Sequence, residues 1–217
     1  DCAEALEEPE QFLGKIEKEC GWADAVVLGP GLGKEPWAVR LVQQVLLSAF
    51  VPIVLDADGL NIVAENPSLS EYFTENVLVT PHVGEMARLS GLEIEEIQAD
   101  LTKAAEDYSE KYGVIIVLKD AATVVVRKDE PIYINSSGCA AMAKAGSGDV
   151  LTGVLAALIA MGMEEGQAAV LGVYLHGLAG EAAEKALGEN GVLARDLADS
   201  LADVEREEAV CGRKKRT

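Results

Sequence analysis

Short apolar runs alternate with longer stretches of helical periodicity along the chain. Runs of Val, Ile and Leu that are too short for helices predict buried strands over 25–28, 51–56, 76–80 and 114–119. A polar turn at 128–130 between two apolar segments predicts a hairpin over 123–135. Helical periodicity predicts helices over 10–20, 36–49, 58–65, 84–90, 94–112, 149–161, 166–187 and 194–201.

The alternation of strands and helices indicates an α/β fold. Repeated strand–helix units predict a mostly parallel sheet with helices on both faces, which is a three-layer arrangement. In such sheets ligands gather at the carboxyl ends of the strands, so the loops that directly follow strands are the most informative. These loops are GPGLG (29–33), DADGLN (56–61), TPHVGE (80–85) and LKDAAT (118–123).

Composition and charge narrow the class of protein. The 217 residues suit one domain, and 49% apolar but only 5% aromatic residues require a core of Val, Leu, Ile and Ala. A net charge of −19 argues against nucleic acids and anionic membranes as partners. The most apolar run, 150–163, is too short to span a bilayer, so we expect no membrane attachment through it.

The cysteines and histidines do not form a metal-binding pattern. The four cysteines, at positions 2, 20, 139 and 211, have neither metal-ligand nor redox spacing, which predicts a reducing, cytoplasmic environment. Two histidines exclude a His-rich metal site, and no metal ligand is assigned. His176 lies in an apolar helix and is expected in the core or at an interface.

The stretch GSGD (146–149) combines a glycine turn, a predicted helix start and a carboxylate. Gly146 and Gly148 tolerate positive φ and leave backbone N–H groups accessible, and the helix dipole adds positive potential. The stretch therefore predicts a site for a phosphate or for a transferring phosphoryl group. Asp149 is either the base that accepts a proton from an attacking hydroxyl or a helix cap.

The other loops allow both a functional and a structural interpretation. LGPGLG (28–33) admits a ligand closely but lacks the G-x-G-x-x-G spacing, so taken alone it is better explained as a tight strand-to-helix turn. Asp56 and Asp58 could hold Mg²⁺ through water or cap the next helix, and we expect Asp56 to face the site and Asp58 to cap. A single histidine such as His82 is usually structural, but its place after a strand, beside three other polar loops, also makes it a candidate ligand contact. Lys119 either balances the charge of a nucleotide or lies on the surface.

Five motifs occur in a fixed order: LGPGLG (28–33), LDADGLN (55–61), TPHVGEMARL (80–89), VLKDAATVV (117–125) and GCAAMAKAGSGDVLTGVLAALIAMG (138–162). In this order they resemble the ADP- or ATP-dependent NAD(P)H-hydrate dehydratase family, a branch of the ribokinase-like enzymes. The resemblance covers most of residues 25–180. The pair TPHxGE and MAxxGSGDVLTG distinguishes it from other ribokinase-like kinases. A ribokinase-like three-layer sandwich is the fold that it implies.

The resemblance implies a repair reaction on NADH and NADPH that have been hydrated at the nicotinamide ring. ADP or ATP, with Mg²⁺, would phosphorylate the ring hydroxyl, and phosphate would then leave so that the double bond returns. The partners implied are thus the hydrated dinucleotide and an adenine nucleotide, in a cytoplasmic protein that we expect to form a homo-oligomer. Whether ADP or ATP is preferred stays open.

The resemblance also assigns roles to residues. Asp149 would be the catalytic base. The anion hole would consist of Gly146, Ser147 and Gly148. The hydrated dinucleotide would contact Gly31, Gly33, His82 and Asp149. The adenine nucleotide would lie against Lys119, Asp120, Ala121, Ala122, Thr123 and Gly148.

The chain departs from the family pattern at three places. Asp120 stands where the family usually has Gly, and Cys139 stands where many members have Asn. Family members also carry a further N-terminal segment, so we expect residues 1–217 to be a single domain that is truncated at its N-terminus relative to the family.

Two other functions remain open at this stage. One is a ribokinase-like kinase that phosphorylates a small alcohol such as a vitamin precursor. The other is a non-catalytic relative that binds nucleotide without turnover, which the charge of Asp120 and the expected truncation favour.

Overall fold

In the computed structural model, which describes residues 7–48 and 51–214, the chain forms one six-stranded sheet. The strands lie in chain order and are β1 (Val26–Leu28), β2 (Ile53–Leu55), β3 (Val77–Val79), β4 (Ile115–Leu118), β5 (Val124–Val126) and β6 (Tyr133–Ile134). Strands β1 to β4 are parallel, whereas β5 and β6 form an antiparallel hairpin at one edge. The predicted α/β class, the four apolar strands and the hairpin are confirmed.

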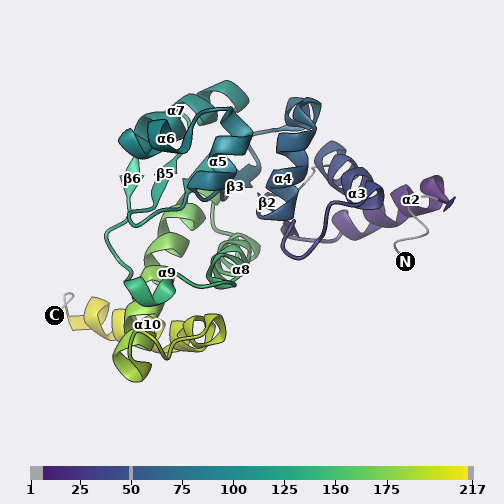
Figure 1. Ribbon diagram of the computed structural model, residues 1–217. Helices are drawn as coiled ribbons and strands as arrows, with labels where there is room; N and C mark the ends of the chain where they lie inside the picture. Colours follow the sequence, from purple (N-terminus) through teal and green to yellow (C-terminus); the bar gives the residue numbers. More distant parts are fainter. Residues whose placement is uncertain (1–6, 49–50, 215–217) are drawn as a thin grey trace.

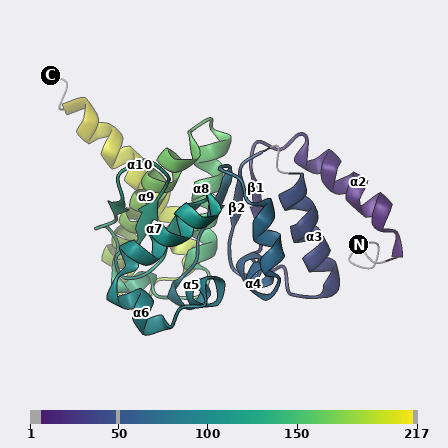
Figure 2. The ribbon, with the colours of Figure 1, turned by 90° about the horizontal axis from the view of Figure 1, so that it is seen from above.

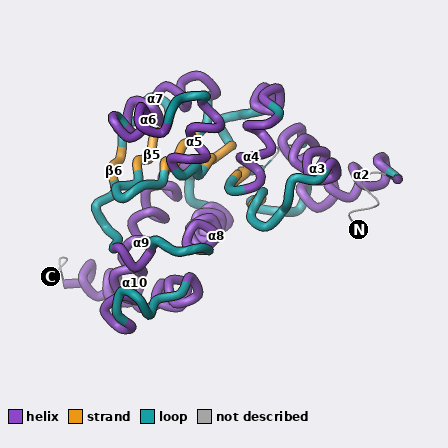
Figure 3. Tube along the Cα trace, viewed as in Figure 1, coloured by secondary structure: helices purple, strands orange, loops and turns teal. Residues whose placement is uncertain are grey.

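Helices cover both faces of the sheet and give the three layers seen in Figures 1 and 3. One face carries α3 (Pro36–Leu47), α4 (Asp58–Glu65), α5 (Val83–Ser90), α6 (Ile94–Ala99) and α7 (Leu101–Tyr112). The other face carries α8 (Ser147–Ala160) and α9 (Glu165–Leu187). The remaining helical elements are α2 (Pro9–Cys20), η1 (Pro67–Tyr72), η2 (Ala140–Met142) and α10 (Ala194–Lys214). Helix α10 packs on α9, and its end projects beyond it in Figure 2.

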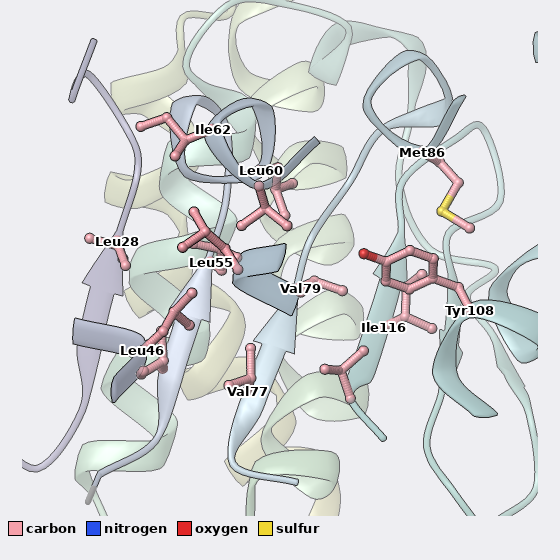
Figure 4. Close-up of a cluster of buried hydrophobic side chains, with 14 of the residues drawn as sticks. Leu28, Leu46, Leu55, Leu60, Ile62, Val77, Val79, Met86, Tyr108 and Ile116 are labelled. Atoms are coloured by element: carbon pink, nitrogen blue, oxygen red, sulfur yellow. The ribbon is translucent and has the colours of Figure 1, made fainter. Parts of the chain in front are cut away.

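The central strands are apolar on both sides, and alternate residues serve the two faces. Val77 and Val79 belong to the core under α3 to α7, whereas Leu78 between them packs with α8 and α9. In β4, Ile116 lies in the first core and Val117 in the second. Successive side chains of a strand point to opposite faces, so a strand covered on both faces must be continuously apolar. Figure 4 shows the first of these two cores.

The helix predicted over 94–112 is two helices in the structure, and the prediction is wrong at this point. Asp100 lies between α6 and α7 with extended backbone angles (φ −153°, ψ 86°). Its carboxylate accepts a hydrogen bond from Lys103 N–H at 3.0 Å, which satisfies an amide at the start of α7. Helix α10 runs on to Lys214, beyond its predicted end at 201. Residue 49, at the predicted end of α3, lies outside the described residues.

The four parallel strands bring their carboxyl ends to the same edge of the sheet. The loops after β1, β2, β3 and β4 therefore meet there, and α8 packs against β1 and β2 from the second face. No helix in the described part of the chain is long and apolar enough to cross a membrane.

Candidate active site at the carboxyl ends of the strands

The loop after β1 is pressed against the loop after β2. Gly29 has φ 126°, and a Cβ atom there would lie 1.8 Å from the carbonyl oxygen of Asp56, so only glycine fits. Asp58 Oδ2 accepts a hydrogen bond from Gly33 N–H at 2.8 Å. This corrects the expectation that Asp58 caps α4. Its carboxylate holds the glycine loop instead, and α4 follows Ala57 with no side-chain cap in the described chain.

Asp56 forms a buried charge network at the end of β2. Only 2% of its side chain is exposed, and its Oδ1 lies 2.8 Å from Lys119 Nζ. Its Oδ2 accepts a hydrogen bond from Thr152 Oγ1 at 3.0 Å, and the same hydroxyl oxygen lies 2.8 Å from the carbonyl oxygen of Gly148. Both carboxylate oxygens are engaged, which a buried charge requires. The network thus joins the ends of β2 and β4 to the first turn of α8.

The first turn of α8 presents backbone N–H groups. Gly146 precedes the helix with φ 88°, a conformation that favours glycine. Ser147, one of the three expected anion-hole residues, uses its N–H inside the turn and donates to the Lys144 carbonyl at 3.3 Å. Within the described chain the N–H groups of Gly148 and Asp149 have no protein acceptor, and we call these two groups the amide cradle. N–H groups at a helix N-terminus suit an anion.

Lys119 lies beside the amide cradle. A Cβ atom at Gly148 would be 3.2 Å from Lys119 Nζ and 3.7 Å from Asp56 Oδ2. Because position 148 has no side chain, the ammonium group and the helix N-terminus approach each other closely. The positive charge of Lys119 and the positive end of the helix dipole therefore meet at one place.

The carboxylate of Asp149 is exposed at the third position of α8. It does not cap its own helix, and it takes part in no hydrogen bond or ion pair with the residues that the structure describes. An exposed carboxylate next to the amide cradle, with no internal partner, is available to accept a proton from a bound molecule.

His82 begins α5 through a capping box with Glu85. The Glu85 N–H donates to His82 Nδ1 at 3.2 Å, and the His82 N–H donates to Glu85 Oε2 at 2.9 Å. Since Nδ1 accepts, a neutral imidazole carries its proton on Nε2. The ring is 55% exposed. The Lys119 N–H donates to the Pro81 carbonyl at 2.8 Å, so the ends of β3 and β4 are joined next to His82.

The residues expected to line the nucleotide divide into two groups. Lys119 turns inward to Asp56, whereas Asp120, Ala121 and Ala122 are exposed and Thr123, directly before β5, is half-buried. Gly31 is also exposed, and a Cβ atom there would meet no heavy atom of the described chain within 4 Å. The exposed residues among them are accessible from solvent at the strand ends. Their contacts with one stay a prediction.

Two residues of this site were not recognised from the sequence. Thr152 follows Gly148 by four residues, and this spacing, which places both on one helix face, was the signal that could have indicated it. His176 is buried in α9, as expected for a core residue, and its Nε2 has no hydrogen-bond partner among the described residues. Burial lowers the pKa of His176 to about 4, the charge of Lys119 acts in the same direction, and the hydrogen bond with the Ser147 backbone opposes both. The ring is therefore neutral at physiological pH.

The site does not resemble a protein-built metal centre. The described residues contain no group of three or more His, Cys, Asp or Glu side chains that could hold a metal ion. Asp56, considered above as a Mg²⁺ ligand, has both oxygens engaged by Lys119 and Thr152.

The sheet, its helical layers and the glycine turn before α8 define a ribokinase-like α/β protein. A ribokinase-like superfamily protein of Enterococcus faecalis superposes with a TM-score of 0.75 at 26% identity, covering 92% of this chain and 68% of its own. Residues 2–203 match the NAD(P)H-hydrate dehydratase family, and the chain belongs to this family.

Individual relatives agree with this assignment. The bifunctional NAD(P)H-hydrate repair enzyme of Moorella thermoacetica is 43% identical over 178 residues, which cover 82% of this chain and 34% of that enzyme. The ADP-dependent (S)-NAD(P)H-hydrate dehydratase of Neisseria meningitidis is 40% identical over 180 residues, 81% of this chain and 60% of that enzyme. The ADP/ATP-dependent NAD(P)H-hydrate dehydratase of Bacillus subtilis, co-crystallised with ATP/Mg²⁺, superposes with a TM-score of 0.73 at 30% identity over 88% of this chain and 69% of its own. The chain thus spans about a third of the length of the bifunctional relatives that it matches.

Proposed function

We propose that this chain dehydrates hydrated NADH and NADPH at the expense of ADP or ATP. Family membership supports the reaction class. The observation that carries the proposal is the exposed Asp149 carboxylate beside the amide cradle. Phosphoryl transfer to a hydroxyl needs a base for the proton and preorganised donors for the phosphoryl charge, and the first turn of α8 supplies both.

The proposed reaction has two stages. The oxygen of the ring hydroxyl attacks the terminal phosphorus of the nucleotide, its proton passes to Asp149, and the bond from phosphorus to the bridging oxygen breaks. The amide cradle stabilises the charge on the phosphoryl oxygens during this step. In the second stage the C–O bond breaks, phosphate leaves with the electron pair, and a proton is lost from the neighbouring ring carbon. The double bond of the nicotinamide ring is thereby restored.

The adenine nucleotide would lie along the loop from Lys119 to Thr123 and reach Gly148. This placement of the nucleotide is supported by Lys119, the first residue of the loop, because its ammonium group lies next to the amide cradle. Mg²⁺ would arrive with the nucleotide phosphates, since oxygen ligands suit it and it usually keeps several waters. When bound, it neutralises charge on the phosphates. Asp56 would act on the nucleotide only indirectly, by holding Lys119.

The hydrated dinucleotide would occupy the loops after β1 and β3. Gly31 is exposed and has no side chain to obstruct an approaching ligand. The Gly33 N–H already donates to Asp58. Gly33 would therefore help the dinucleotide only by having no side chain, and not by donating this hydrogen bond. His82 would donate from Nε2, because its Nδ1 is engaged by Glu85.

The test is the return of the near-ultraviolet absorbance of NADH from chemically hydrated NADH, with Mg²⁺ and either ADP or ATP. Recovery that requires a nucleotide would support the proposal and show which nucleotide serves. A reaction without nucleotide serves as the control for spontaneous reversal. Nucleotide binding by calorimetry without any recovery would contradict the proposal, as would a stable phosphorylated alcohol as the product.

A further inference from the structure

The exposed side of α5 carries an arginine beside the candidate site. Arg88 is exposed, and its Nε donates a hydrogen bond to Asn61 Oδ1 on α4 at 2.9 Å. Helices α4 and α5 pack side by side, as Figure 2 shows. Asn61 is uncharged, and Arg88 forms no ion pair with the residues that the structure describes. In a chain with a net charge of −19, Arg88 thus presents an uncompensated positive charge to solvent.

The guanidinium group of Arg88 is directed towards the start of α5. Arg88 follows Gly84 by four residues, which places both on one face, and the side chains of a helix lean towards its N-terminus. A Cβ atom at Gly84 would lie 4.0 Å from Arg88 Nη1 and 3.0 Å from His82 Cε1. The arginine and the histidine ring therefore flank the same point, and Gly84 places no side chain between them.

Three hydrogen-bond donors meet at this point. The Gly84 N–H, in the first turn of α5, has no protein acceptor within the described chain. The His82 ring is 55% exposed, and a neutral ring carries its proton on Nε2 because Nδ1 accepts from Glu85. Arg88 adds planar N–H groups, which suit the oxygens of a phosphate. We call Gly84, His82 and Arg88 the α5 donor cluster.

One carboxylate lies close to the α5 donor cluster. Glu85 Oε1 is 3.6 Å from His82 Nε2, but the Glu85 side chain is only 7% exposed. Its Oε2 accepts the His82 N–H at 2.9 Å, as part of the capping box. Glu85 therefore holds the start of α5 from the buried side, and the exposed donors stay available to an anion.

The α5 donor cluster lies at the same edge of the sheet as the amide cradle. His82 pairs with Lys119 across the ends of β3 and β4, and the Lys119 ammonium adjoins the cradle. The proposed reaction brings together two molecules that both carry phosphates. Because like charges repel, each of them needs positive groups of its own. The amide cradle with Lys119 can serve the nucleotide, and the α5 donor cluster is placed for the other molecule.

We propose that the α5 donor cluster binds a phosphate group of the hydrated dinucleotide. Asn61 orients Arg88 for this contact. The group is either the diphosphate, which hydrated NADH and NADPH share, or the 2′-phosphate, which only the NADPH form carries. The identity of the ligand rests on the proposed function, whereas the binding of an anion by the cluster does not.

The experiment compares KM values in variants of the cluster. Arg88→Gln removes the charge, Arg88→Lys keeps the charge without the planar donors, and Asn61→Ala removes the group that orients Arg88. Arg206→Gln is the matched control, because it makes the same change at a 78% exposed arginine of α10. KM is determined separately for hydrated NADH, hydrated NADPH and the adenine nucleotide.

We expect Arg88→Gln to raise KM for the hydrated dinucleotide on the order of tenfold to a hundredfold, because a charged hydrogen bond is lost. The values of kcat and of KM for the nucleotide should stay close to those of the wild type. Arg88→Lys and Asn61→Ala should have intermediate effects. A rise for both dinucleotides would assign the diphosphate, and a rise for hydrated NADPH alone would assign the 2′-phosphate.

Three results would overturn the proposal. They are an unchanged KM for both dinucleotides in Arg88→Gln, an equal rise in Arg206→Gln, and a rise of KM for the adenine nucleotide alone. The last result would place the nucleotide, and not the dinucleotide, at the α5 donor cluster.

Nuclear magnetic resonance gives a second readout that needs no activity. Titration with inorganic pyrophosphate should shift the amide resonance of Gly84 in the wild type and in Arg206→Gln, but not in Arg88→Gln. A shift at Gly148 should persist in all three proteins, because the amide cradle is unchanged. If the wild type shows the Gly84 shift without dehydratase activity, the proposed function fails and the anion site stands. If Gly84 does not respond in the wild type, the anion site is refuted whatever the activity.

Discussion

Lys119 Nζ lies 2.8 Å from Asp56 Oδ1, although the two residues are 63 positions apart in the sequence. The pair joins the ends of β2 and β4. The side chain of Asp56 is 2% exposed and that of Lys119 is 20% exposed. The carboxylate is therefore buried, whereas the lysine is partly accessible to solvent. Asp56 thus fixes the direction of a lysine whose charge adjoins the amide cradle.

The first prediction concerns this ion pair. Asp56→Ala leaves Lys119 without its buried partner and should lower the free energy of unfolding by about 3–5 kcal/mol, because an unpaired buried charge is strongly destabilising. Urea unfolding measures this loss. A double-mutant cycle with Lys119→Met should show coupling, and strictly additive effects would contradict the argument. The exposed pair Lys34–Glu65 is the control, since Glu65→Ala should cost no more than about 1 kcal/mol.

The second prediction concerns the proposed base. Asp149→Asn should lower kcat on the order of a hundredfold to ten-thousandfold, because the amide cannot take the proton of the ring hydroxyl. The dissociation constant of ADP, measured by calorimetry, should stay close to that of the wild type. Asp129→Asn is the control: Asp129 lies in an exposed turn with φ 61°, where Asn is also tolerated. Near-normal kcat in Asp149→Asn would show that another group is the base.

The third prediction uses two glycines of α8. Gly148→Ala places a methyl group 3.2 Å from Lys119 Nζ, beside the amide cradle, and should lower kcat on the order of tenfold to a hundredfold. Gly153→Ala meets no heavy atom of the described chain within 4 Å and should stabilise the protein by about 0.5–1 kcal/mol with unchanged kcat. Steady-state kinetics and thermal unfolding distinguish the two. If both substitutions changed kcat equally, the absence of a side chain at position 148 would not matter for catalysis.

The fourth prediction follows from the lowered pKa of His176. The unfolded chain binds this proton near the ordinary pKa of 6.5, whereas the folded chain binds it only near about 4. Between these values the unfolded state holds more protons, so the free energy of unfolding falls as the pH decreases. His176 should account for up to about 3 kcal/mol of this fall.

The comparison of wild type with His176→Leu isolates this contribution, because other titrating groups are common to both. Urea unfolding at several pH values between 6.5 and 4 should give a shallower pH dependence for the variant. Parallel curves for the two proteins would show that His176 titrates normally in the folded state.

Local pattern was sufficient for the elements of the sheet and for the position of the candidate site. Continuous apolar runs such as 76–80 predicted buried strands, because side chains of a doubly covered strand must be apolar on both faces. The glycine turn at 146–148 predicted a helix start with accessible amides, since glycine conformation and helix termini are local properties. Polar loops after parallel strands predicted where the chemistry gathers.

Only the tertiary structure decided how the polar groups of that site are shared. Asp58, which was predicted to cap α4, instead accepts a hydrogen bond from the Gly33 N–H. The Ser147 N–H donates to a carbonyl oxygen of its own turn. The two partners of Asp56, Lys119 and Thr152, come from segments far from it in the chain. A polar group has several compatible partners in the sequence, and the packing of strands and helices decides which of them arrives within hydrogen-bond distance.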